Sequence, residues 1–190
     1  MQSKNKYARS KAADLNTDAI IVAYGSNLPT SFPSEQLSAS QAFATVVKAL
    51  QDKGLKVTKI SRLWRSRAWP DPNDPPYINA ALAVDTHLQP IELMKSLHEV
   101  ERDAGRVRDG RPNRPRVVDL DLIAYGREVL DGSGGLHLPH PRAAERLFVM
   151  GPIRDILPQW RHPVLNETAE SLYEKSTVGT DAYPLEDDGA

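Results

Sequence analysis

The hydrophobic pattern of the chain begins with a short strand, a helix and a second strand. Residues 19–24 form an apolar run that ends at Gly25, which is typical of a β-strand. Hydrophobic residues at helical spacing then predict a helix that opens near Pro33 and closes at Gly54. Residues 55–63 alternate between hydrophobic and polar side chains, which predicts the next strand. This part of the chain therefore has the order β-α-β.

The same order returns further along the chain. Residues 77–84 form another β-rich run, a helix is predicted from Pro90 to Gly105, and residues 117–125 are again strand-like. Two β-α-β units in tandem favour an α+β protein with a ferredoxin-like α/β sandwich. We expect a largely antiparallel sheet with helices packed on one of its faces.

Both ends of the chain differ from the part between them. Residues 1–17 have no periodicity, and residues 175–190 hold Gly, Pro, Thr and an acidic run. We expect both segments to be disordered, solvated tails. One domain is expected over residues 18–174, where residues 129–174 add a short hairpin and one or two short helices after the second unit.

The composition narrows the class of protein. Apolar residues make up 40% and charged residues 26% of the 190 positions, as in an ordinary globular protein. The absence of cysteine excludes disulfides, thiolate zinc sites and a cysteine nucleophile. The net charge of −1 favours neither nucleic acid nor a membrane surface as a partner, and no apolar run approaches the length of a membrane helix. We expect a cytoplasmic monomer.

Two acidic residues interrupt the apolar run at 117–125. Side chains two positions apart share a face of a strand, so Asp119 and Asp121 project together, roughly 7 Å apart. Val118, Leu120 and Leu122 then point into the core. Mg²⁺ is usually held by one or two carboxylates, with waters and substrate phosphates completing its shell. Two acids on a solvent-facing sheet edge would give the same pattern, so this pair alone leaves both interpretations open.

Arginines crowd the segment directly before the acidic pair. Residues 105–116 contain five arginines against a single aspartate, punctuated by Gly and Pro. The planar guanidinium suits bidentate contact with phosphate. A solvated basic turn is the alternative for this segment alone. Next to Asp119 and Asp121, however, the segment favours a site that binds a polyphosphate and neutralises charge during phosphoryl transfer.

Two further clusters carry polar and aromatic side chains. His140 and Arg146 are six residues apart near a predicted turn and could complete a phosphate site. Tyr77 and Asn79 share one face of their strand and offer a ring for stacking and an amide that both donates and accepts. That pair could recognise a flat heterocycle, or it could be a core tyrosine with a polar neighbour. None of the common glycine-rich phosphate-loop motifs is present.

Taken together, these residues resemble the family of 6-hydroxymethyl-7,8-dihydropterin pyrophosphokinases of folate biosynthesis. The resemblance covers about residues 18–172. Its motifs are, in order, Gly25-Ser26-Asn27, Tyr77-x-Asn79, Gly105-Arg106-x-Arg108, Arg116-x-x-Asp119-x-Asp121, and Leu138-Pro139-His140 followed by Arg146-x-Phe148.

The resemblance implies that a pyrophosphoryl group passes from ATP, as co-substrate, to the hydroxymethyl group of the pterin, with release of AMP. It implies that Asp119 and Asp121 hold two Mg²⁺ ions and that Arg106 and Arg116 stabilise the transferring group. It further implies pterin-binding roles for Ser66, Trp69, Tyr77, Asn79 and Phe148, and ATP-binding roles for Glu101, Arg108, His140 and Arg146.

The chain departs from the family pattern at a few positions. Asn113 stands where well-known members have a tryptophan, and Arg67 follows Ser66 where a Thr-Pro-like pair is usual. Gly135 and His137 replace an arginine and a threonine that bind ATP in some members. Arg111 or Arg114 could compensate in ATP binding.

Two other classes of function were weighed against this resemblance. One is a ferredoxin-like module that binds nucleotides or RNA without this activity. Such a module requires aromatic residues on its central strands and a basic face, and only Tyr77 approaches that pattern. A different Mg²⁺-dependent nucleotidyl transferase would share the acidic pair but would leave Tyr77, Asn79 and Phe148 unexplained as a set.

Overall fold

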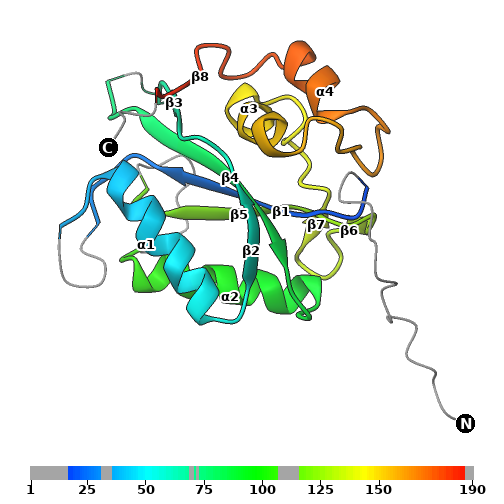
Figure 1. Cartoon of the computed structure of the whole chain (residues 1–190), viewed down its shortest axis with the longest axis horizontal. Coiled ribbons are helices and arrows are strands. Elements are labelled where there is room, and N and C mark those ends of the chain that lie inside the picture. The colour runs from blue at the N-terminus through cyan, green and yellow to red at the C-terminus, as the bar shows by residue number, and fades with distance from the viewer. Residues whose placement is uncertain (1–16, 31–35, 69–70, 72, 107–115, 187–190) are drawn as a thin grey trace, which may run out of the picture.

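A six-stranded antiparallel sheet forms the centre of the molecule (Figure 1). The computed structural model describes residues 17–30, 36–68, 71, 73–106 and 116–186. In the sheet, β1 (Ile20–Ser26) lies between β4 (Tyr77–Asp85) and β5 (Asp119–Tyr125) and is antiparallel to both. The strand order β5-β1-β4 is therefore that of a ferredoxin-like sandwich, which confirms the expected fold class.

The other strands lie at the outer side of β4 and in a separate hairpin. β2 (Lys56–Ile60) and β3 (Trp64–Ser66) both pair with β4, and β8 (Tyr183–Pro184) pairs with β3. β6 (Leu130–Asp131) and β7 (His137–Leu138) form the hairpin that the sequence predicts within residues 129–138. The alternation over residues 55–63 predicted only β2, because β3 is three residues long and its pattern is too short to recognise.

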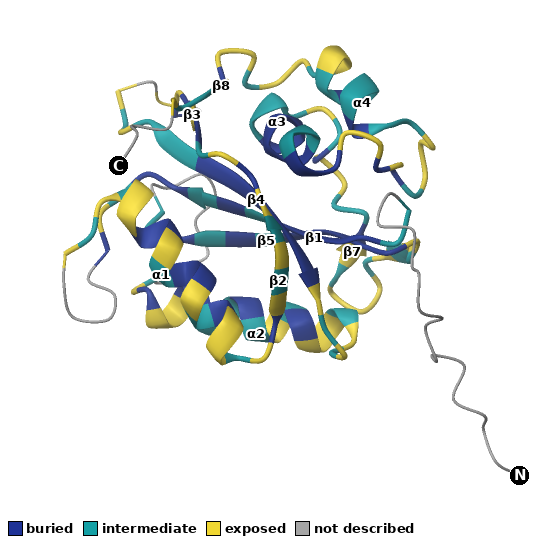
Figure 2. Cartoon of the chain, in the orientation of Figure 1, coloured by how far each residue is buried: buried dark blue, intermediate teal, exposed yellow. Residues whose placement is uncertain are grey.

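Helices cover both faces of the sheet, whereas the sequence pattern led us to expect them on one. α1 (Ala39–Asp52) and α2 (Pro90–Asp103) lie on one face, while α3 (Leu147–Ile156) and α4 (Ala169–Lys175) lie on the other (Figure 1). The reason is visible in the two central strands, which are apolar on both sides and therefore have two faces to bury (Figure 2).

Alternate residues of β1 enter the two cores. Ile20, Val22 and Tyr24 pack with α1 and α2, and Ile21 packs on the opposite side with residues of α3. In β4 the residues toward α3 are Ala81 and Ala83, whose small side chains let that helix lie close to the sheet. Val118, Leu120 and Leu122 point into the first core, as their alternation predicts.

The first helix begins later than the sequence suggests. Residue Ser38 caps α1: its hydroxyl accepts the Gln41 N–H, and the Gln41 side chain accepts the Ser38 N–H. Thr30 and Leu37 form an isolated antiparallel bridge just before this cap. These local bonds satisfy backbone groups at the cap, so α1 begins at Ala39. Pro33, near which the sequence pattern placed the start, lies outside the described residues.

The segment after α4 also differs from expectation. Residues from 175 onward were expected to be a solvated tail, yet the described part runs past α3 to β8, where it pairs with β3 (Figure 1). The segment has few apolar residues, and its backbone hydrogen bonds, such as Leu185 N–H to the Leu63 carbonyl at 2.7 Å, hold it in place. Hydrophobic patterning cannot reveal a contact of this kind. Residues 1–16 of the expected N-terminal tail (residues 1–17) and the last residues, 187–190, lie outside the described part of the chain.

Gly151 allows α3 to approach β3. A Cβ at Gly151 would lie 2.7 Å from two ring carbons of Trp64, whose indole N–H donates to Asp155 at 2.9 Å. Because this hydrogen bond fixes the ring, Gly151→Ala is expected to destabilise the fold by about 1–2 kcal/mol, despite the better helix propensity of alanine. The free energy of unfolding in urea measures the effect.

Gly134→Ala is the matched control, because a Cβ there would meet only the Ile91 side chain, at 3.8 Å. It should change the free energy of unfolding by less than about 0.5 kcal/mol. Equal stability of the two variants would show that Trp64 does not constrain α3.

Candidate active site

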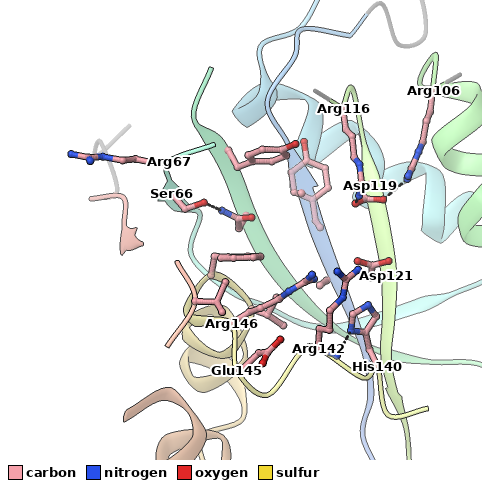
Figure 3. A pocket seen from close by; sticks show the side chains of 18 of the residues that line it. Ser66, Arg67, Arg106, Arg116, Asp119, Asp121, His140, Arg142, Glu145 and Arg146 are labelled. Carbon is pink, nitrogen blue, oxygen red and sulfur yellow. Dashed lines mark hydrogen bonds and ion pairs between the residues drawn. The ribbon is translucent and has the colours of Figure 1, made fainter. Parts of the chain in front are cut away.

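A pocket of about 580 Å³ opens beside the start of α3, over the ends of β1, β4 and β5 (Figure 3). Ten of the side chains selected from the sequence line it: Ser66, Tyr77, Asn79, Arg106, Arg116, Asp119, Asp121, His140, Arg146 and Phe148. They come from three strands, two loops and a helix. The fold thus brings together residues that are far apart in the sequence.

The register of the sheet places the two halves of the pocket on either side of β1. Gly25 of β1 is opposite Asn79 of β4 and also opposite Asp119 of β5. Two residues earlier in β1, Ala23 pairs with Asp121. The aromatic and amide side of the pocket and its acidic side are therefore one strand apart, with no large side chain between them.

The acidic side contains a network of ion pairs. Asp119 accepts hydrogen bonds from both Arg106 and Arg116 (Figure 3), and Arg106 also donates to Glu101. Glu101 is 1% exposed and also accepts the Leu120 N–H at 2.8 Å. It does not line the pocket. The structure therefore places Glu101 behind Arg106, where it orients the guanidinium.

Arg116 is also held through its backbone. Its N–H donates to the Asn27 side chain at 2.7 Å, and its carbonyl accepts the Asn27 N–H at 3.0 Å. The Asn27 amide then donates to the Pro75 carbonyl at 3.0 Å. Asn27 is part of a sequence motif to which we assigned no role. Its position shows that it ties together the segments before β4 and before β5.

Burial and like charge act on Asp121. Burial, and secondly the nearby Asp119 carboxylate, raise the pKa of Asp121 above its ordinary value. Burial lowers the pKa of His140, and the Asp121 carboxylate opposes that shift. Arg146 lies on the same side of the pocket as Asp121 and His140 (Figure 3). Negative charge at Asp121 is therefore destabilised and would be favoured by an added cation.

The opposite side of the pocket is lined by amide, hydroxyl and aromatic side chains. The Asn79 amide donates to the Ser66 hydroxyl at 3.0 Å, and both residues are buried. Tyr77 is half-buried, which raises the pKa of its hydroxyl. The Phe148 ring lies 5.7 Å from the Arg146 guanidinium carbon. Two rings and a fixed amide are suited to a planar heterocycle with polar edges.

Some selected residues lie elsewhere. The described residues do not include Trp69 and Arg108. They also do not include Asn113, which departs from the family pattern, or Arg111 and Arg114. Gly135 and His137 are in or next to the β6–β7 hairpin and do not line the pocket. Three charged lining residues were not selected from the sequence: Arg67, Arg142 and Glu145. Arg142 and Glu145 lie between His140 and Arg146 in the sequence, and this proximity to two selected residues could have identified them as part of the site.

The donor set suits a hard divalent cation that is shared with a substrate. Within the described ranges, no group of three or more His, Cys, Asp or Glu side chains could enclose a metal ion. Asp119 and Asp121 provide carboxylate oxygens on one face of β5. Mg²⁺ typically binds in this way, through one or two carboxylates plus phosphate oxygens. The residues therefore fit Mg²⁺ bound together with a phosphorylated ligand.

Comparison with known proteins agrees with the geometry. Residues 21–158 match the model of the 7,8-dihydro-6-hydroxymethylpterin-pyrophosphokinase family. The chain belongs to this family. The 2-amino-4-hydroxy-6-hydroxymethyldihydropteridine pyrophosphokinase of Pseudomonas aeruginosa is 34% identical over 166 residues, which cover 87% of this chain and 96% of that protein.

Other proteins that the chain resembles are much longer. The folic acid synthesis protein fol1 of Pneumocystis carinii is 33% identical over 183 residues, 96% of this chain but only 23% of that protein. A solved structure of Plasmodium falciparum HPPK-DHPS matches with a TM-score of 0.62 at 12% identity, over 84% of this chain and 44% of that one. That match supports the fold. Within the described ranges, none of the helices combines the length and apolar character that a membrane span requires.

Glu101 offers a test of the ion-pair network. Glu101→Gln keeps an acceptor for the Leu120 N–H but leaves the partly buried Arg106 with less opposing charge. We expect a loss of about 3 kcal/mol in the free energy of unfolding, since removal of one partner from a buried pair is costly. Urea unfolding measures it. Glu99→Gln, on the same helix as Glu101, breaks the more exposed pair with Lys53 at the end of α1; it is the control and should leave the midpoint nearly unchanged. A Glu101→Gln midpoint equal to that of the control would contradict the role of the network.

Proposed function

We propose that the pocket transfers a pyrophosphoryl group from ATP to 6-hydroxymethyl-7,8-dihydropterin, giving AMP and the pterin diphosphate in folate biosynthesis. The observation that carries the proposal is the pairing across β1, which sets Asn79 and Asp119 opposite the same glycine. A heterocycle on one side then has its substituent directed toward the acidic side. Family membership and the named relatives support the same reaction.

The pterin is proposed to bind between Tyr77 and Phe148. Asn79 is buried and its amide is oriented by Ser66, so it can bond the polar edge of the ring with little loss of freedom. Ser66 lies at the end of β3, where the neighbouring backbone can complete the recognition of that edge. Trp69 is proposed to contribute from the loop that follows. A preorganised polar group in a buried pocket gives orientation as well as affinity.

The triphosphate of ATP is proposed to lie over the charged side. His140 and Arg146 bind its oxygens from the loop that leads to α3, with Arg108 proposed to assist. Arg106 and Arg116 stabilise the charge on the group in transfer, and Glu101 contributes through Arg106. In the transfer the hydroxymethyl oxygen bonds to the β-phosphorus as the bond to the α,β-bridging oxygen breaks, and AMP leaves. Such a transfer depends mainly on positioning and electrostatic stabilisation.

Two Mg²⁺ ions are proposed to bind with ATP at Asp119 and Asp121. Bound Mg²⁺ would neutralise phosphate charge and favour ionisation of the attacking hydroxyl. The two aspartates hold their carboxylates on the same face of β5, at the edge of the sheet nearest the proposed triphosphate site. A monomer is proposed as the active unit.

The reaction itself is tested by measuring AMP formation from MgATP with and without 6-hydroxymethyl-7,8-dihydropterin. We expect AMP only when the pterin is present. Formation of ADP would instead indicate a simple phosphoryl transferase. Binding of both ligands without turnover would favour a nucleotide-binding module that lacks this activity.

The acidic pair provides a second test. Asp119→Asn and Asp121→Asn are each expected to lower the rate of AMP formation by about 100-fold or more, because charge stabilisation is largest in the transition state. Circular dichroism should show folded protein in both cases. Asp85→Asn, at the exposed far end of β4, is the control and should retain wild-type activity. Wild-type turnover by either site variant would remove the metal assignment.

A further inference from the structure

The segment that follows α4 contacts both walls of the pocket. We call residues 176–186 the C-terminal strap, and they lie beyond the residues matched by the family model. The strap runs from α4 past the start of α3 and ends beside β3 (Figure 1). On its way it meets Phe148 on one side of the pocket and the residues after β3 on the other.

The first contact of the strap fixes the backbone around Arg146. The N–H groups of Thr177 and Val178 both donate to the Glu145 carbonyl at 3.0 Å, and the Leu147 N–H donates to the Val178 carbonyl at 2.9 Å. Arg146 has no side-chain cap for α3, so these bonds take the place of one. The Val178 side chain itself lines the pocket. The strap therefore sets the direction in which the chain leaves Arg146 and enters α3.

The second contact is with the Phe148 ring. Gly179 has a φ of +67°, and a Cβ at this position would lie 2.4 Å from ring carbon Cδ1 and 2.9 Å from Cε1. Such distances are far below van der Waals contact, so the ring rests directly on the glycine backbone. Only a residue without a side chain allows Phe148 to keep this position.

The third contact is with the opposite wall. The Asp181 carboxylate accepts the N–H of Arg67 at 2.6 Å, one residue after Ser66. Ser66 in turn holds the Asn79 amide. β8 then pairs with β3 through Tyr183 and Pro184. One short segment thus connects the ring wall and the amide wall of the same pocket.

We propose that the C-terminal strap positions the heterocycle-binding half of the pocket, with Gly179 and Asp181 as positioning residues for Phe148 and for the Ser66–Asn79 pair. The proposal rests on the proposed function for the identity of the heterocycle. The strap does not itself contact Asp119, Asp121 or the two arginines among its described contacts. A change confined to Gly179 or Asp181 should therefore affect binding of the pterin and leave binding of ATP unchanged, because the backbone hydrogen bonds on either side of Arg146 remain.

Gly179→Ala tests the proposal. The added methyl group must displace the Phe148 ring, so the KM for 6-hydroxymethyl-7,8-dihydropterin should rise by at least about tenfold, the effect of a lost stacking contact. The KM for ATP should stay within about twofold, since the Arg146 backbone bonds remain. A general loss of structure would instead raise both KM values together.

Gly54→Ala is the matched control. Gly54 also has a positive φ, +84°, but a Cβ there would meet nothing within 4 Å, and it follows α1 on the far side of the sheet. The two variants share the backbone strain, and only Gly179→Ala adds the collision with Phe148. Gly54→Ala should keep both wild-type KM values.

Asp181 gives an independent test of the second wall. Asp181→Ala removes the acceptor for the Arg67 N–H, and the pterin KM should rise by about threefold, whereas Asp181→Asn retains a side-chain oxygen and should restore the wild-type value. Binding of 6-hydroxymethylpterin, followed by fluorescence without nucleotide, should weaken in parallel for Gly179→Ala and Asp181→Ala.

The outcomes separate the two proposals. A wild-type protein that forms no AMP in the presence of the pterin would overturn the proposed function. A wild-type protein that is active, with unchanged pterin KM and unchanged pterin binding in Gly179→Ala, would overturn the role of the strap. Equal rises in the KM for ATP and for the pterin would also overturn it, because the effect would then be structural.

Discussion

The site depends on the pairing of one strand with two neighbours. At Gly25 the central strand β1 has no side chain, and Asn79 and Asp119 flank it from the two sides. A Cβ there would lie 3.9 Å from the Asn79 side chain and 4.0 Å from the Asp119 Cβ. Sheet register is strict, because a slip of one residue would turn every side chain to the other face. The two chemical halves of the pocket are therefore held at a fixed separation by backbone hydrogen bonds.

Two of the carboxylates in the site, Glu101 and Asp119, are paired with arginines before any substrate is considered. Three carboxylates, Glu101, Asp119 and Asp121, lie with two guanidinium groups, of which Arg106 contacts two of the acids. In the proposed complex, triphosphate oxygens would pair with the guanidinium groups, and cations would pair with Asp119 and Asp121. Binding would then exchange one set of ion pairs for another, which limits the desolvation penalty that isolated buried charges would incur.

Much of this arrangement could be predicted from the sequence. The strands that form the floor of the pocket have clear periodicity, and Asp119 and Asp121 are conspicuous because they interrupt an apolar strand. The second helical layer and the strap could not be predicted in the same way. The strap is held by backbone groups and by the absence of a side chain at Gly179, neither of which leaves a hydrophobic pattern. The family resemblance implied an ATP-binding role for Glu101, whose burial behind Arg106 depends on how α2 lies against β5.

The buried position of Glu101 also bears on how the sequence can diverge. A single replacement of Glu101, Arg106 or Asp119 leaves a partly buried charge without its counterpart. A protein in which only some of the three have been replaced is therefore less stable than one in which all or none have been replaced. These three positions should accordingly vary together among descendants of this chain. Glu99 of α2 is also ion-paired, with Lys53, but this pair is more exposed and should constrain the two positions less.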